Sequence, residues 1–163
     1  MNKQLTLIRH AKSSWGDNSL PDYARELNKR GQNDALHMGE ALHERRIKFD
    51  QVLCSSAIRA RQTLSRLNEA LELEDESIRY LDDLYCASVA TLLEIIQQVD
   101  NSKHHIAIIA HNPGLEDLAA RLSNERKTFS TCSVMQIEFD MQNWREINRT
   151  TGTQRLFLSP KTI

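Results

Sequence analysis

The most constraining feature of the sequence is the segment HIAIIA at residues 105–110, in which every residue after the first is apolar. A strand that is apolar on both of its sides is typical of a sheet that is covered on both faces. Such a sheet needs helices packed against each face. The segment therefore predicts a layered α/β fold with this strand near its centre.

Segments with strand and helix patterns alternate along the rest of the chain. Further strands are predicted at residues 4–9, 51–54, 77–81, 133–139 and 154–158. Apolar residues at helical spacing predict helices over residues 28–47, from 55–56 to 71, from 88 past 96, and from 113 past 122. This alternation predicts one domain over residues 1–163, an α/β protein with three α/β/α layers around a mostly parallel central sheet.

Polar side chains mark the predicted starts of these helices. Asn28 and Ser88 are each placed to cap a helix, and Ser55-Ser56 supply a cap for the helix that ends near residue 71. Asn112 followed by Pro113 predicts a further helix start, with the Asn112 side chain as the cap and Pro113 at the first helical position.

Composition excludes several classes of function. The formal net charge of −1 gives the whole chain no strong attraction to nucleic acid or to an anionic membrane. No apolar stretch approaches the roughly 20 residues of a membrane span, and the first residues do not resemble a signal peptide. Three cysteines without close spacing fit a reducing compartment and no zinc site. We expect a cytoplasmic monomer with no metal and no other cofactor.

Reactive and cationic side chains follow three of the predicted strands. Arg9-His10 ends the first strand, Arg59 lies in the first turn of the helix after the second strand, and His111 follows the buried strand. Ligands of open α/β sheets bind at the carboxyl ends of the strands. Helix N-termini and arginine guanidinium groups both favour phosphate. The sequence therefore predicts a phosphate site at this edge of the sheet.

Three segments carry a family resemblance: LIRHAKSSW at residues 7–15, LCSSAIRARQT at 53–63 and AHNPGLEDLA at 110–119. They resemble the signatures of the histidine phosphatase superfamily, which includes phosphoglycerate mutases and SixA-type phosphohistidine phosphatases. RELNKRG at 25–31 and GTQRLFLSPK at 152–161 are more similar to the SixA-type group. The resemblance implies a phosphoglycerate mutase-like fold. The family usually has glycine after the Arg-His pair, whereas this chain has Ala11, for which we expect a negative φ.

The resemblance also implies roles for individual residues. His10 would be the nucleophile that carries a transient phosphoryl group, and Arg9, Arg59 and His111 would hold the phosphate. Further expected substrate contacts are Arg25, Ser13 and Asn112, and Trp15 would either wall the entrance or simply pack. The general acid would come from the segment YLDDLYCAS, where Asp83 is our choice over Asp82. The alternative that both are ordinary turn residues stays open.

The expected substrate follows from leaving-group chemistry and chain length. Imidazole leaves phosphorus more readily than an alkoxide does, so a weak or absent general acid favours phosphohistidine. We see no insertion between Arg59 and His111 that could form a lid, which favours a phosphohistidine on a partner protein such as a histidine phosphotransfer domain. The alternatives are a phosphatase of small phosphate esters and a phosphoprotein-binding module without turnover.

Overall fold

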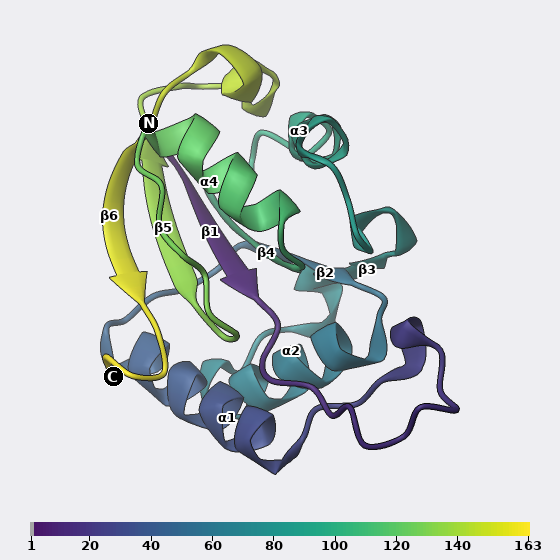
Figure 1. The fold of residues 1–163 in the computed structure, drawn as a ribbon. Coiled ribbons are helices and arrows are strands. Elements are labelled where there is room, and N and C mark those ends of the chain that lie inside the picture. Colours follow the sequence, from purple (N-terminus) through teal and green to yellow (C-terminus); the bar gives the residue numbers. More distant parts are fainter. Residues whose placement is uncertain (1) are drawn as a thin grey trace.

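A six-stranded sheet of order β3-β2-β4-β1-β5-β6 forms the centre of the protein in this computed structural model, which describes residues 2–163 (Figure 1). The strands are β1 (Lys3–Arg9), β2 (Gln51–Ser55), β3 (Ile78–Leu81), β4 (His105–Ala110), β5 (Val134–Phe139) and β6 (Thr153–Leu158). The first four strands of the spatial order run parallel, and β5 and β6 add an antiparallel edge. The α/β fold with a mostly parallel sheet is confirmed.

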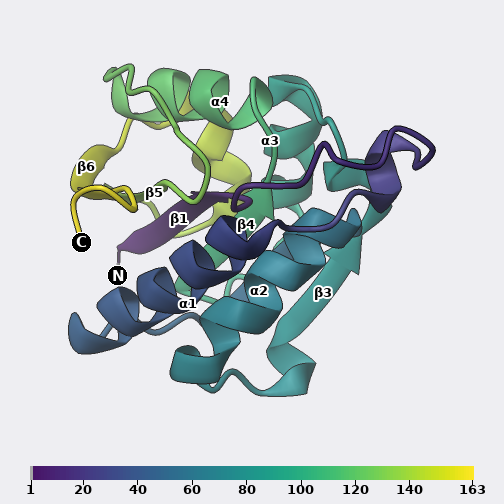
Figure 2. The same ribbon diagram turned by 60° about the horizontal axis from the view of Figure 1, so that its bottom comes forward.

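Helices cover both faces of the sheet, as Figures 1 and 2 show. Helices α1 (Lys29–Glu44) and α2 (Ile58–Leu71) pack over one core, whereas α3 (Val89–Gln97) and α4 (Gly114–Ser123) pack over the other. Short 3-10 helices lie in the segments between these elements: η1 (Asp22–Ala24), η2 (Asp75–Ser77), η3 (Asp82–Leu84) and η4 (Trp144–Arg149). Within the described residues, no helix has the length and apolar character needed to cross a membrane.

The register of the parallel strands aligns their carboxyl ends. Arg9 of β1 lies opposite Ala110 of β4, and Ile109 of β4 lies opposite Cys54 of β2. All six residues of β4 are buried, as the apolar run predicted. The residues that follow β1, β2 and β4 therefore emerge side by side at one edge of the sheet.

The predicted helix starts are confirmed for two helices and wrong for two. Asn28 and Ser88 accept hydrogen bonds from the first turns of α1 and α3. No side chain caps α2, which begins after Ala57, or α4, which begins at Gly114 after Pro113. The residues expected to cap these two helices make other hydrogen bonds. Ser55 bonds His111, and Ser56 bonds Asp82. Asn112 donates to the backbone oxygen of Phe129.

Of the two outer strands of the sheet, β3 is short and β6 is irregular. Strand β3 has four residues and lies between the turns of η2 and η3. Strand β6 pairs with β5 through a register shift between Gln136 and Ile137. On this strand, Arg155 forms an ion pair with Glu138 of β5 at 2.7 Å.

Gly39 provides a direct test of how closely α1 and α2 pack. A Cβ atom added at this position would lie 2.5 Å from the carbonyl oxygen of Leu67 on α2. We expect Gly39→Ala to lower the free energy of unfolding by about 1–3 kcal/mol, because the helix backbones must move apart. Thermal unfolding should then shift down by roughly 2–4 °C per kcal/mol.

Gly16→Ala is the matched control for this experiment. The nearest atom to a Cβ at Gly16 is Ser14 Oγ at 3.4 Å, an ordinary contact, so the midpoint should stay unchanged. Alanine is a better helix former than glycine, so an unchanged or higher midpoint for Gly39→Ala would show that the close packing is absent.

Candidate active site

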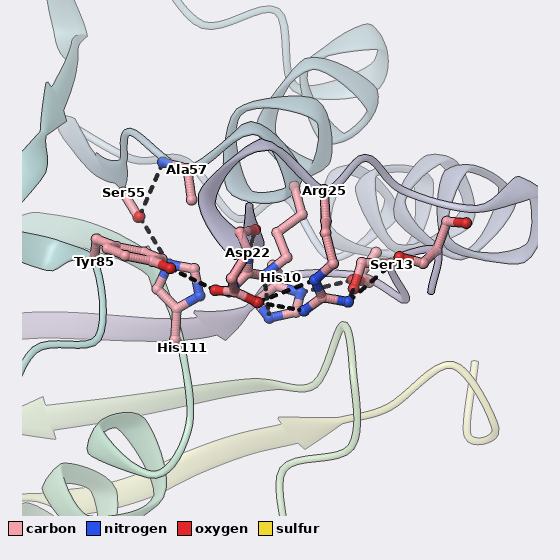
Figure 3. Close-up of polar contacts among 11 residues, drawn as sticks. His10, Ser13, Asp22, Arg25, Ser55, Ala57, Tyr85 and His111 are labelled. Atoms are coloured by element: carbon pink, nitrogen blue, oxygen red, sulfur yellow. Dashed lines mark hydrogen bonds and ion pairs between the residues drawn. The ribbon is translucent and has the colours of Figure 1, made fainter. Parts of the chain in front are cut away.

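A cavity of about 270 Å³ opens at the edge of the sheet where the parallel strands end. Seven of the predicted site residues line it: Arg9, His10, Ser13, Arg25, Arg59, His111 and Asn112. They come from the ends of β1 and β4, the first turn of α2, and the loop that joins β1 to α1. Figure 3 shows the polar contacts among several of these side chains. Asp83 is the one predicted site residue outside this lining.

His10 is held so that one ring nitrogen carries no proton. Its side chain lies directly after β1, and the residue is only 6% exposed. Nδ1 lies 2.7 Å from the carbonyl oxygen of Ala11. A carbonyl can only accept a hydrogen bond, so Nδ1 carries the proton and Nε2 keeps its lone pair.

Burial keeps the His10 ring neutral. Removal of the ring from water is the largest cause that lowers its pKa, to about 3, and the nearby His111, Arg59 and Arg9 lower it further. The bond to Ala11 opposes this shift. Desolvation thus lowers the pKa of this ring more than the nearby arginines do.

Ala11 fits the position where the family has glycine. It is not among the described residues with positive φ, as predicted. Its N–H donates to Thr63 Oγ1 at 2.9 Å, and the residue is fully buried. The methyl group is therefore part of the core, and the loop after β1 is anchored to α2.

Arg59 reaches the nucleophile from α2. The residue is 4% exposed, and its Nε donates to His10 Nε2 at 3.3 Å. Its Nη1 and Nη2 donate to the backbone oxygen and to Oδ2 of Asp22, at 2.8 and 3.0 Å. The guanidinium plane is therefore fixed from two directions.

Arg9 and Asn112 share one backbone acceptor. Arg9 Nη1 donates to the carbonyl oxygen of Phe129 at 2.9 Å, and Asn112 Nδ2 donates to the same oxygen at 3.0 Å. The segment before β5 thus orders side chains from the ends of both β1 and β4. This contact explains why Asn112 does not cap α4.

His111 faces the cavity from the end of β4. Its Nε2 lies 2.8 Å from Ser55 Oγ, which also accepts the N–H of Ala57 at 3.3 Å. The serine hydroxyl can therefore donate to Nε2, which leaves the ring proton on Nδ1. Burial is the largest cause that lowers the pKa of His111, to about 4, and Arg59 lowers it further.

Three buried polar atoms at the cavity have no hydrogen-bond partner among the described residues. They are Arg9 Nε, His111 Nδ1 and Asn112 Oδ1. Each such group costs about 1–3 kcal/mol when it is left unpaired. With the tautomer assigned above, two of the three are donors, and they lie beside other arginines. The arrangement therefore favours an anionic ligand of small size.

The loop between β1 and α1 forms one wall of the cavity. Arg25 Nη1 donates to Ser13 Oγ at 2.8 Å, and both residues are buried. The guanidinium of Arg25 lies 3.5 Å from the ring centroid of Trp15. Trp15 is 72% exposed and lines the cavity, so it stands at the entrance and is not a core residue.

The segment that was expected to supply an acid contributes different residues. Asp83 is exposed on η3 and makes no hydrogen bond or ion pair with any residue that the structure describes. Asp82 accepts a hydrogen bond from Ser56 Oγ. Instead, Cys86 lines the cavity, and the ring of Tyr85 lies 5.4 Å from that of His111.

Sequence reasoning missed three residues that shape the site: Ser55, Asp22 and Tyr85. Ser55 was interpreted as a helix cap, although its place at the carboxyl end of a predicted strand was a usable signal. Asp22 had only a weak signal, its position three residues before Arg25 in the same loop. Tyr85 donates to Asp22 Oδ2 at 2.5 Å across 63 residues of sequence, a contact with no local pattern.

Comparisons with known proteins identify the family of the chain. Residues 5–107 match the model of the histidine phosphatase superfamily (branch 1). An uncharacterized protein of Mycobacterium tuberculosis is 35% identical over 117 residues, which cover 72% of this chain and 70% of that protein.

Two solved structures share the fold over nearly their whole length. A candidate phosphohistidine phosphatase SixA from Nakamurella has a TM-score of 0.87 at 22% identity, covering 98% of this chain and 97% of that one. The protein histidine phosphatase SixA in complex with tungstate has a TM-score of 0.82 at 23% identity, with 97% of both chains covered. The chain belongs to the histidine phosphatase superfamily, and its fold is that of the SixA-type members.

Proposed function

We propose that the protein is a metal-independent phosphatase that uses His10 as its nucleophile and removes phosphate from phosphohistidine on a partner protein. The observation that carries this proposal is the neutral, buried His10 ring, whose Nε2 faces a cavity lined by three arginines. The family match supports a phosphatase, and the likeness to SixA structures supports the choice of phosphohistidine.

The reaction would proceed by two displacements at phosphorus. In the first, the hydrogen bond from Arg59 Nε–H passes from His10 Nε2 to a phosphoryl oxygen, the freed lone pair attacks phosphorus, and the leaving group departs with the electron pair of its bond to phosphorus. The ring becomes a phosphorylated cation, which the Nδ1–H bond to Ala11 stabilises. In the second displacement, water attacks the phosphorus, the electron pair of the P–N bond returns to Nε2 to restore the neutral ring, and inorganic phosphate leaves with the protons of the water.

The phosphate-binding groups would lower the barrier of both steps. Arg9, Arg25 and Arg59 supply planar donors, and His111 supplies its Nδ1–H. Preorganised donors of this kind stabilise the charge on phosphoryl oxygens in the transition state by about 3–4 kcal/mol each. Ser13 would act through Arg25, and Asn112 Oδ1, which can only accept, would take a hydrogen bond from a protonated phosphate oxygen or from the attacking water.

The surroundings of the leaving group support phosphohistidine over an ester. An alkoxide leaving group needs a proton from a general acid, and Asp83 remains our candidate for that role. It lies on the exposed surface outside the cavity lining, so it would have to approach the substrate from solvent. An imidazole leaving group needs less assistance, which matches a cavity lining that contains no carboxylic acid among the described residues.

The entrance supports a protein substrate. The cavity is small, and Trp15 stands exposed beside it on a loop that extends beyond the sheet in Figures 1 and 2. A phosphohistidine side chain is short, so its protein must approach this rim closely. A histidine phosphotransfer domain in the cytoplasm remains the kind of partner that we propose.

His10→Ala should reduce phosphate release from a phosphohistidine protein by at least roughly 10³-fold. The variant should also fail to form the acid-labile phosphoenzyme that wild type forms with a radiolabelled substrate. His43→Ala is the matched control, because this histidine is exposed on α1 away from the cavity. Release that persists in His10→Ala would contradict the proposed mechanism, and phosphate binding without turnover in wild type would favour a binding module.

The ring of His10 should titrate far below free histidine. Burial favours the neutral form, so the folded pKa of about 3 means that Nε2 stays unprotonated at every pH well above 3. NMR of the ring nitrogens between pH 5 and 8 should therefore show no His10 protonation. In the chain unfolded by urea, the same ring should titrate near the ordinary value of about 6.5. A folded midpoint near that value would contradict the burial argument.

Trp15→Ala should separate protein substrates from small ones. We expect kcat/KM to fall roughly 10-fold for a phosphohistidine protein, because an exposed aromatic at a contact surface contributes about 1 kcal/mol or more. The same variant should hydrolyse phosphoimidazole within about twofold of wild type. An equal loss on both substrates, or a preference of wild type for small esters, would favour the metabolite phosphatase.

A further inference from the structure

We propose that Asp22, fixed by Tyr85, is a positioning residue that aims the Arg59 guanidinium at the reacting nitrogen of His10. This inference rests on the proposed function, because it assigns a role within the same site. Neither residue bonds His10, so both act through Arg59.

The carboxylate of Asp22 connects three parts of the chain (Figure 3). Its Oδ1 accepts from Nε of Arg25 at 3.0 Å and lies 3.0 Å from Nη2 of the same arginine. Its Oδ2 accepts from Arg59 Nη2 at 3.0 Å and from the hydroxyl of Tyr85 at 2.5 Å. The backbone oxygen of Asp22 accepts from Arg59 Nη1 as well.

These contacts determine where the remaining donor of Arg59 points. The guanidinium is planar, so fixing Nη1 and Nη2 also fixes the direction of its Nε–H. That hydrogen points to His10 Nε2, at an N-to-N distance of 3.3 Å. Without Asp22, the long arginine side chain would lose this orientation, and an error of about 1 Å in such a donor can cost 10²-fold in rate.

Ion pairing with two arginines also stabilises the position of the Asp22 carboxylate. Among the described residues, it is the one carboxylate that is paired with Arg25 and Arg59. The hydrogen bond from Tyr85 is the largest cause that lowers the pKa of Asp22, to about 2, and Arg59 adds to it. The same bond raises the pKa of Tyr85 to about 12, so the phenol remains a donor.

Tyr85 in turn is fixed by aromatic neighbours. Its ring meets the ring of Tyr23 edge-on at 5.2 Å and the ring of His111 edge-on at 5.4 Å. The Arg59 guanidinium lies 5.8 Å from its centroid. The tyrosine therefore joins the η1 loop to the end of β4, and its hydroxyl holds the Asp22 carboxylate from the side opposite Arg25.

The test compares Asp22→Asn, Tyr85→Phe and the double variant with Asp17→Asn. Asp17 is the matched control, because it is an exposed aspartate of the same loop whose side chain bonds only Ser19 among the described residues. Substrates are phosphoimidazole and a phosphohistidine protein. The measurements are kcat, KM and the thermal midpoint.

Asp22→Asn should lower kcat by roughly 10–100-fold while KM stays the same or falls, because a negative charge beside the phosphate is removed. Tyr85→Phe should give a smaller loss of kcat in the same direction. The double variant should be no slower than Asp22→Asn alone, because the tyrosine acts through the aspartate. Asp17→Asn should match wild type.

A purely structural role gives a different result. Loosening of the loop would raise KM, lower the thermal midpoint and leave kcat nearly unchanged, and that outcome would overturn the inference. Additive losses in the double variant would overturn the part that assigns Tyr85 to Asp22.

An NMR measurement keeps the test independent of turnover. The Nε–H signal of Arg59, assigned by its absence in Arg59→Lys, should exchange slowly in wild type and rapidly in Asp22→Asn. If wild type shows no His10-dependent turnover, the proposed function fails, yet this signal still decides whether Asp22 orders Arg59. An Nε–H signal that is unchanged in Asp22→Asn would refute the positioning role.

Discussion

The parallel pairing of β2, β4 and β1 is the constraint on which the rest of the structure depends. Strand β4 is buried along its whole length, so it has to lie between two neighbours and beneath helices on both faces. The parallel register then places the chain segments that leave these strands at one edge. His10, Ser55 and His111 are close together for this reason, although about a hundred residues separate the first from the last.

Most of the fold could be predicted because its signals are local. The apolar run of β4 and the helical spacing of apolar residues are properties of short segments, and the structure confirms them. The antiparallel pairing of β5 with β1 and with β6 was not predicted, since it depends on which neighbours the last strands find. The starts of α2 and α4 were wrong because Ser55 and Asn112 were interpreted as caps. In the sequence, a serine or asparagine before a helix looks the same whether its side chain caps the helix or bonds another residue of the site.

The candidate site was predictable to the extent that strand ends determine it. Arg9, His10 and His111 directly follow strands, so the topology alone brings them together. Asp22 and Tyr85 were missed because their contact depends on how a long loop folds back over α2. Position within the segment YLDDLYCAS favoured Asp83, whereas the carboxylate that contacts Arg25 and Arg59 is that of Asp22, in a different loop.

The edges of the sheet have a consequence for the behaviour of the protein at high concentration. An open sheet presents unpaired backbone groups that can recruit a strand from another chain. Strand β3 offers only four residues between two tight turns, which is too short for a stable foreign ladder. Strand β6 bears the register shift and the Arg155–Glu138 ion pair, which interrupt a flat, apolar template. Edge-to-edge aggregation is therefore disfavoured at both ends of the sheet, even though its interior strands are strongly apolar.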